Sequence, residues 1–177
     1  MIIFFIGFMG SGKSHEANKL ATALSISCFD LDNEIEKIQG KSITFIFEED
    51  GEARFREIER DALRQLVDNI ENTSVKNAVI ACGGGTPCFH DNMSFMNANG
   101  VTIWLNPPIE TLVSRLRSET AHRPLVKTME GKSLENFIAQ KLQERNQYYQ
   151  QAQLEIQEPE IDTSHLINLI NHAKELS

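Results

Sequence analysis

The chain has 177 residues, which suits one domain with a sizeable buried core. Its hydrophobic fraction of 41% and charged fraction of 24% are ordinary for a globular protein, and its formal net charge is -8. Because an acidic surface repels a phosphate backbone, this charge argues against nucleic-acid binding. A small anionic substrate is still compatible with it, since a few arginines can dominate one pocket.

Short apolar runs alternate with longer helical patterns along the chain. We predict buried strands at 2–6, 79–82 and 101–105, with weaker candidates at 25–30 and 154–157. Helical periodicity is found at 53–67, at 134–149 and in the tail from Ser164. Residues 118–132 are polar and contain Pro124 and Gly131, which predicts a mobile loop. The alternation predicts an α/β fold with a parallel sheet, helices on both faces and ligands at the carboxyl ends of the strands.

The strongest motif is GFMGSGKS, which runs from Gly7 to Ser14 and fits G-x4-G-K-[ST]. It directly follows the apolar run 2–6 and opens a helical stretch. Glycines let backbone N–H groups point at phosphates, and the helix N-terminus adds a favourable dipole. We expect Lys13 to contact the β- and γ-phosphates and Ser14 to bind Mg²⁺. The alternative is a plain glycine-rich turn, but spacing and context together favour binding of ATP or GTP.

Two carboxylates follow the second predicted strand, in the sequence FDLD. Asp30 and Asp32 are two residues apart, so in an extended segment they point the same way. One could hold the water shell of a metal ion, and the other could accept a proton from an attacking hydroxyl. The alternative is that these residues cap a helix that begins near Asn33.

Three further groups of residues have weaker signals. Arg56 and Glu59 are helix neighbours, so the carboxylate could orient the guanidinium for a substrate carboxylate, or the two could form a plain surface ion pair. Three glycines, 83–85, follow the strand at 79–82, and they indicate either close approach to a ligand or a tight turn. Arg123 in the predicted mobile loop and Arg145 on the long helix could each be ordinary surface arginines.

The combination of these motifs resembles shikimate kinases. The chain contains GxxGSGKS, FDLD, DGE-x-x-FR-x-IE, GGG, RPL and R-x-x-Y in that order, from Gly7 to about Ala152. The second glycine-rich stretch, GGGTPCFHDNM, is similar to a bacterial branch of that family. The pairing of DGE-x-x-FR-x-IE with GGG is the specific part of the resemblance, because general nucleotide kinases lack it.

The resemblance implies a fold of the nucleoside-monophosphate-kinase type. It has a five-stranded parallel core, a substrate-binding helical segment at about 32–60 and a lid at about 118–132, within a single domain of residues 1–177. The implied activity transfers the γ-phosphate of ATP to the 3-hydroxyl of shikimate, giving shikimate 3-phosphate and ADP in aromatic amino acid biosynthesis. The implied cofactor is Mg²⁺, and the implied partners are ATP and shikimate alone, bound by a monomer.

The resemblance also implies a role for each matched residue. The nucleotide contacts are Gly10, Ser11, Gly12, Lys13, Ser14, His15 and Arg123. Ser14 and Asp30 organise the metal ion, the latter through water. The substrate contacts are Asp32, Phe47, Phe55, Arg56, Glu59, Gly83, Gly84, Gly85 and Arg145. The residues that act in catalysis are Lys13, Asp32 as the base and Arg123 over the phosphates.

Three positions depart from the family pattern. His15 stands where threonine is usual, Ala17 replaces a common glycine, and Gln147 replaces the proline of R-x-P-x-Y. We expect a displaced His15 side chain, which puts nucleotide affinity in question, and a slightly weaker placement of Arg145. None of the three changes removes a chemical group that the reaction needs.

Two other function classes compete with this interpretation. One is another small-metabolite kinase, such as a gluconate kinase or a nucleoside-monophosphate kinase; the other is a nucleotide-binding protein without catalysis. The motifs FDLD and DGE-x-x-FR disfavour the first, and the set of Lys13, Asp32 and Arg123 disfavours the second. Three cysteines without metal-type spacing, an apolar start without a basic region and no run of membrane-spanning length predict a cytoplasmic protein.

Overall fold

The centre of the molecule is a parallel β-sheet. The computed structural model describes residues 1–72, 77–118 and 132–175. In this part of the chain the sheet has five strands in the order β2-β3-β1-β4-β5, and every neighbouring pair is parallel. The strands are β1 (Ile2–Gly7), β2 (Ser27–Asp30), β3 (Ala78–Ala81), β4 (Gly100–Leu105) and β5 (Leu154–Ile156). All five lie where the sequence predicts them, although the two weaker candidates are shorter than expected.

The apolar runs form strands because helices cover both faces of the sheet. Phe4 in β1 belongs to one core cluster, and its neighbours Ile3 and Phe5 belong to a second cluster on the other face. Both faces of β1 are therefore buried. This explains why its sequence is a continuous apolar run rather than an alternation of apolar and polar residues.

The helices divide between the two faces. In chain order they are α1 (Lys13–Leu24), α2 (Leu31–Gln39), α3 (Ile43–Asn72), the 3-10 helix η1 (Thr86–Cys88), α4 (Asn92–Asn99), α5 (Ile109–Ser118), α7 (Lys132–Tyr149) and α8 (Thr163–Glu175). Helices α1 and α8 pack against one cluster, and α2, α3, α4, α5 and α7 contribute to the other. The predicted α/β fold is confirmed.

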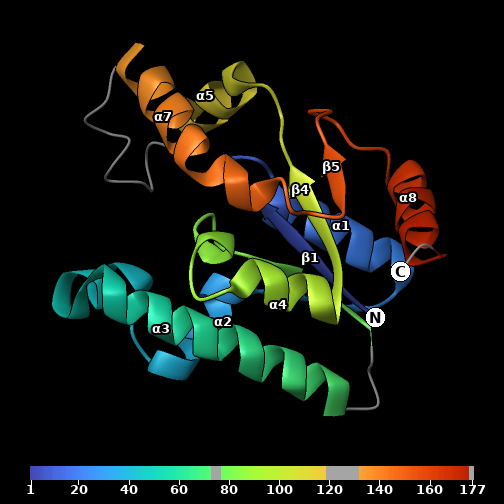
Figure 1. Ribbon diagram of the computed structural model, residues 1–177, viewed down its shortest axis with the longest axis horizontal. Coiled ribbons are helices and arrows are strands. Elements are labelled where there is room, and N and C mark those ends of the chain that lie inside the picture. Colours follow the sequence, from blue (N-terminus) through green and yellow to red (C-terminus); the bar gives the residue numbers. More distant parts are fainter. Residues whose placement is uncertain (73–76, 119–131, 176–177) are drawn as a thin grey trace.

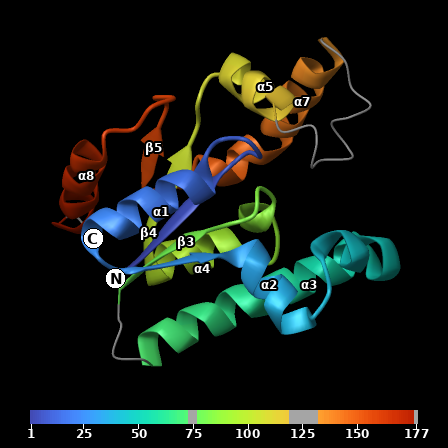
Figure 2. The same ribbon diagram turned by 180° about the vertical axis from the view of Figure 1, so that it is seen from behind.

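Two pairs of helices extend beyond the sheet. In both views, α2 and α3 lie on one side of the molecule, and α5 and α7 lie on the other side (Figures 1 and 2). Helix α3 is longer than the predicted helix 53–67, and it is interrupted at Gly51, where the backbone has φ 77° and ψ 171°. Within the three described ranges, no helix combines the length and apolar character that a membrane crossing needs.

The topology brings several functional motifs together. Strands β1, β2 and β3 are neighbours, and at their carboxyl ends they lead into the glycine-rich loop 7–14, into Asp30 and into glycines 83–85. Carboxyl ends of parallel strands share one edge of the sheet, so these three motifs meet there. The candidate site is at this edge.

Candidate active site

The loop between β1 and α1 is shaped to surround an anion. Gly10 and Gly12 have φ angles of 78° and 97°, a region that side-chain-bearing residues rarely adopt. Gly12 is the N-cap of α1, so N–H groups at the start of this helix lack intrahelical acceptors. The Lys13 ammonium group folds back over the loop and donates a hydrogen bond to the Phe8 carbonyl at 2.9 Å. The loop therefore combines N–H groups, a helix dipole and a cation.

Ser14 and Asp30 form an oxygen-rich pair beside this loop. The Ser14 hydroxyl donates a hydrogen bond to Oδ2 of Asp30 at 2.7 Å. Asp30 ends β2, and its Oδ1 accepts a hydrogen bond from the backbone N–H of Asp32 at 3.1 Å. Asp30 is thus the N-cap of α2 as well as the partner of Ser14. The two uses that the sequence left open, capping and facing the phosphate loop, occur together.

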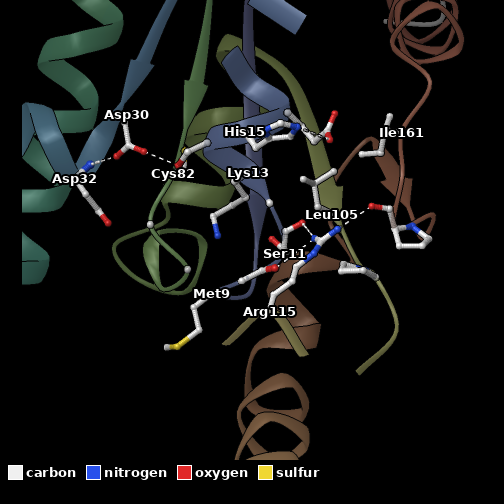
Figure 3. Close-up of a pocket in the computed structure, with 18 of the residues that line it drawn as sticks. Met9, Ser11, Lys13, His15, Asp30, Asp32, Cys82, Leu105, Arg115 and Ile161 are labelled. Carbon is white, nitrogen blue, oxygen red and sulfur yellow. Dashed lines mark hydrogen bonds and ion pairs between the residues drawn. The ribbon is translucent and has the colours of Figure 1, made fainter. Parts of the chain in front are cut away.

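Asp32 lies in the first turn of α2 rather than in an extended segment. The expected geometry of two carboxylates on one strand was wrong, because Asp30 caps a helix that starts at Leu31. Asp32 still faces the site: a Cβ added at Gly83 would lie 3.0 Å from its Oδ1. Figure 3 shows the side chains of Asp32 and Lys13 extending toward the same open region.

The environment of Asp32 disfavours its charged form. Burial raises the pKa of this carboxyl to about 6, and the negative charges of Asp30 and Glu59 add to the effect. Lys13 and Arg56 oppose the shift and keep it moderate. At neutral pH the group is therefore mainly ionised, and its raised pKa makes it a better proton acceptor than an ordinary aspartate.

Arg56 and Glu59 form a buried ion pair. Only 8% of Arg56 and 1% of Glu59 are exposed, and Nη1 of the arginine donates to Oε2 of the glutamate at 2.8 Å. The alternative of a solvated surface pair was wrong. The guanidinium lies against Gly85, where an added Cβ would be 2.5 Å from Nη2. A larger residue at this position would force the guanidinium to move from its place beside Glu59.

Arg145 reaches the same glycine loop from α7. Its Nη1 donates to the Gly84 carbonyl at 3.2 Å, and the hydroxyl of Tyr149 donates to the same oxygen at 2.5 Å. Arg56 and Arg145 therefore lie beside consecutive glycines of one loop. The sequence did not show which of Tyr148 and Tyr149 packs against this loop. In the structure Tyr149 is the fully buried one, which holds α7 against the loop.

Phe47 and Phe55 form an aromatic wall beside Arg56. Their ring centroids are 4.4 Å apart, and the Arg56 guanidinium carbon lies 6.0 Å and 5.0 Å from them, respectively. Phe47 precedes the break at Gly51 and Phe55 follows it, so the change of helix direction brings the two rings together.

A cavity of about 600 Å³ lies beside the glycine-rich loop and the carboxyl ends of β2 and β3, and Arg56, Arg145, Phe47 and Phe55 are not among the residues that line it. It is lined by the glycine-rich loop, by Asp30 and Asp32 and by Gly83 and Gly84, and Figure 3 shows most of these residues. His15 also lines it, and its side chain is 79% exposed, in accord with the displaced position that we expected. No residue of 119–131 is described, so the predicted Arg123 and nearly all of the predicted lid lie outside the described residues.

Arg115 is a site residue that the sequence analysis missed. From α5 its Nη1 donates to the carbonyls of Ser11 at 3.0 Å and Gly10 at 3.4 Å, and its Nη2 donates to the carbonyl of Pro159 at 2.8 Å. Figure 3 shows it extending along the cavity wall. Arg115 links the phosphate loop to the segment after β5. No motif surrounds it, so only the fold could show its position.

A glycine-rich loop after the central strand β1, with an aspartate at the end of β2 that binds the Ser14 hydroxyl and a sheet order of β2-β3-β1-β4-β5, defines an α/β P-loop kinase. The family model described as "Shikimate kinase" matches residues 9–172. The chain belongs to the shikimate kinase family, whose members transfer a phosphoryl group from ATP to shikimate.

Individual members of the family agree with this assignment. A shikimate kinase of Parabacteroides distasonis is 40% identical over 152 residues, which cover 86% of this chain and 84% of that protein. The crystal structure of the Bacteroides thetaiotaomicron enzyme has a TM-score of 0.84 at 37% identity and covers 99% of this chain and 97% of its own. The Acinetobacter baumannii enzyme, solved in complex with shikimate, has a TM-score of 0.76 at 27% identity, with 99% and 89% covered.

Proposed function

We propose that this chain transfers the γ-phosphate of ATP to the 3-hydroxyl of shikimate. The observation that carries the proposal is the meeting of three groups at glycines 83–85. Asp32 lies beside Gly83, Arg145 beside Gly84 and Arg56 beside Gly85. A hydroxylated carboxylic acid needs this combination of one acceptor for a hydroxyl proton and cationic forks for a carboxylate.

The nucleotide would bind with its phosphates in the loop 7–14. Besides Lys13 and the backbone N–H groups, the buried Ser11 hydroxyl supports this assignment, because it has no hydrogen-bond partner among the described residues. An unpartnered buried hydroxyl in a loop of this shape suits a phosphate oxygen. Arg115 holds the loop by two of its carbonyls, so that the N–H groups keep their direction. We also propose that Arg123 contacts the phosphates.

Ser14 and Asp30 fit a magnesium ion. Both offer hard oxygen atoms, and Mg²⁺ in kinases is held by one or two such protein groups together with phosphates and water. Among the residues that the structure describes, no cluster of three or more His, Cys, Asp or Glu side chains could hold a metal by itself, which agrees with this type of site. When bound, the ion would neutralise charge on the β- and γ-phosphates.

The acceptor is activated by Asp32. The 3-hydroxyl oxygen attacks the γ-phosphorus, a new O–P bond forms, the bridging bond to the β-phosphate breaks and ADP leaves. The hydroxyl proton passes to the Asp32 carboxylate, whose raised pKa suits this role. Arg56 and Arg145 bind the carboxylate and fix the ring, while Phe47 and Phe55 cover it. Positioning and charge neutralisation contribute most of the catalysis in such transfers.

The cellular compartment and the oligomeric state are also part of the proposal. Cys28, Cys82 and Cys88 are free thiols, which supports a reducing compartment and hence the cytoplasm. We propose that the enzyme is a monomer with one domain, and size-exclusion chromatography with light scattering would test the monomer directly.

A coupled assay of ADP release tests the function. Shikimate, gluconate and several nucleoside monophosphates are compared as acceptors, and we expect turnover with shikimate alone. Asp32→Asn should lower kcat about 10²- to 10⁴-fold and leave ATP binding unchanged, because only the proton acceptor is lost. A higher kcat/KM with any other acceptor would refute the substrate assignment. Near-normal turnover of Asp32→Asn would instead remove Asp32 from the role of base.

A further inference from the structure

The guanidinium of Arg56 has an aromatic neighbour that the reaction scheme does not use. The Phe89 ring centroid lies 4.4 Å from the guanidinium carbon, closer than those of Phe55 and Phe47. Phe89 is also one of the large apolar side chains that remain exposed, at 36%. Because the Phe89 ring is exposed, packing in the core does not account for its position. The cation–π contact with Arg56 does account for it.

The turn after Phe89 is strained. His90 and Asp91 are consecutive non-glycine residues in the left-handed region, with φ angles of 51° and 55°. Such residues persist only where surrounding contacts determine the backbone, and strain of this kind is often found at functional sites.

Arg64 supplies these contacts. Its Nη2 donates to the His90 carbonyl at 3.0 Å, and its Nη1 donates to Oδ1 of Asn92 at 2.7 Å. Asn92 is fully buried, and its side-chain amide donates to the Thr86 carbonyl at 3.0 Å. Arg64 therefore ties the His90–Asn92 end of the segment 86–92 to α3, the helix that also carries Arg56, and Asn92 links this end to Thr86.

The same segment reaches Arg56 by a second route. The hydroxyl of Thr86 is buried and donates to Oε1 of Glu59 at 2.6 Å. The other carboxylate oxygen of Glu59 accepts from Arg56. The segment 86–92 thus contacts the Arg56 guanidinium in two ways. Its Thr86 binds Glu59, which binds the edge of the guanidinium, and its Phe89 packs on the face of the guanidinium.

We infer that Phe89 is a positioning residue for Arg56, presented by a turn that Arg64 anchors. The inference rests on the proposed role of Arg56 in binding the substrate carboxylate. A long arginine side chain has many rotamers, and fixing it before the substrate arrives lowers the entropy lost on binding. A ring held by a rigid turn fixes the guanidinium without occupying any of its N–H donors, which stay available for carboxylates.

The test compares Phe89→Leu with Phe89→Tyr. We expect Phe89→Leu to raise KM for shikimate about 5- to 20-fold, while kcat and KM for ATP stay within about twofold of wild type. Phe89→Tyr keeps the ring and should restore KM. Phe45→Leu is the matched control: Phe45 is also exposed and lies near a cation, Lys41, and it should leave all constants unchanged.

A double-mutant cycle shows whether the effect passes through Arg56. In an Arg56→Ala background, Phe89→Leu should cause no further loss of shikimate affinity by calorimetry. If Phe89→Leu lowers shikimate affinity equally in the wild-type and Arg56→Ala backgrounds, the inference is overturned. It is also overturned if Arg56→Ala raises KM for shikimate but Phe89→Leu leaves it unchanged. If Arg56→Ala itself leaves shikimate affinity unchanged, the proposed role of Arg56 fails and the inference fails with it.

Arg64→Gln gives an independent measurement. It removes the anchor of the turn without touching Arg56 or Phe89, so KM for shikimate should rise in the same direction by about 3- to 10-fold. Thermal unfolding monitored in parallel identifies any general loss of fold. An Arg64→Gln variant with wild-type KM would show that the anchored turn has no part in positioning.

Discussion

Two carboxylates of different character share the Arg56 guanidinium. Glu59 is buried and binds Nη1, whereas Glu52 is 58% exposed at its side chain and accepts from Nη2 at 3.0 Å and from Nε at 3.3 Å. Because the Glu52 carboxylate is largely exposed, water can solvate it when it leaves Arg56, so Glu52 can be displaced. The edge of Arg56 that carries Nε and Nη2 is thus the edge that a substrate carboxylate would take.

Glu52→Gln should therefore improve shikimate binding. Glu52 competes with the substrate for Arg56, and its loss should lower KM for shikimate about two- to fivefold with kcat unchanged. The measurement is steady-state kinetics at low ionic strength. Glu57→Gln is the control, because the Glu57 side chain on α3 is 46% exposed but pairs with Arg54. A raised KM in Glu52→Gln would show instead that Glu52 orients Arg56 for the substrate.

The residues whose positions the sequence indicated are those that belong to motifs of fixed local spacing. Lys13, Ser14 and Asp30 occupy the positions that their motifs indicate, because strand, loop and helix are consecutive in the chain. The residues that the sequence analysis missed contact partners that are far away in the sequence. Arg115 binds the Ser11 carbonyl over 104 positions, and no local pattern encodes that contact. Phe89 was missed for the same reason, because its partner lies on another element.

At the scale of the elements, the break in α3 determines how the aromatic wall of Phe47 and Phe55 is formed. Gly51 has φ 77° and ψ 171°, a combination that is nearly exclusive to glycine. Helical periodicity predicted only the part after this residue, since a glycine beside Asp50 indicates a helix boundary, whereas the family resemblance implied a helical segment at about 32–60 that also includes the turns before it. Both parts are helical, and the change of direction at Gly51 lets the Phe47 and Phe55 rings meet.

Gly51→Ala should destabilise the protein by about 1–3 kcal/mol. No atom lies within 4 Å of an added Cβ, so the loss would come from backbone strain alone. Gly40→Ala is a matched control, because Gly40 also has open space around it but has the milder angles of φ 63° and ψ 17°. Urea denaturation of both variants measures the difference. A loss at Gly51 no larger than that at Gly40 would contradict this account of the break.

At the scale of the whole molecule, the site concentrates negative charge in a protein that is already acidic. Asp30, Asp32 and Glu59 lie close enough to influence one another, and the chain carries a formal net charge of -8. The proposed role of Asp32 as a proton acceptor requires its carboxyl to be ionised, while its surroundings favour the protonated form. The catalytic site should therefore lower the stability of the fold, and the size of this effect should depend on pH.

Asp32→Asn should make the protein more stable at neutral pH. The folded-state pKa of Asp32 is about 6 against an ordinary value of 3.8, so between these values the folded protein binds more protons than the unfolded chain. The contribution of the Asp32 carboxyl to the free energy of unfolding is fully present at low pH and is lost as pH rises toward 6 and beyond. Removing the charge should therefore add about 1–2 kcal/mol at pH 7.5, after allowance for solvent screening, and much less at pH 4.5. Urea denaturation of both proteins at the two pH values measures this. A gain that is equal at both, or larger at pH 4.5, would show that Asp32 does not carry a raised pKa in the folded protein.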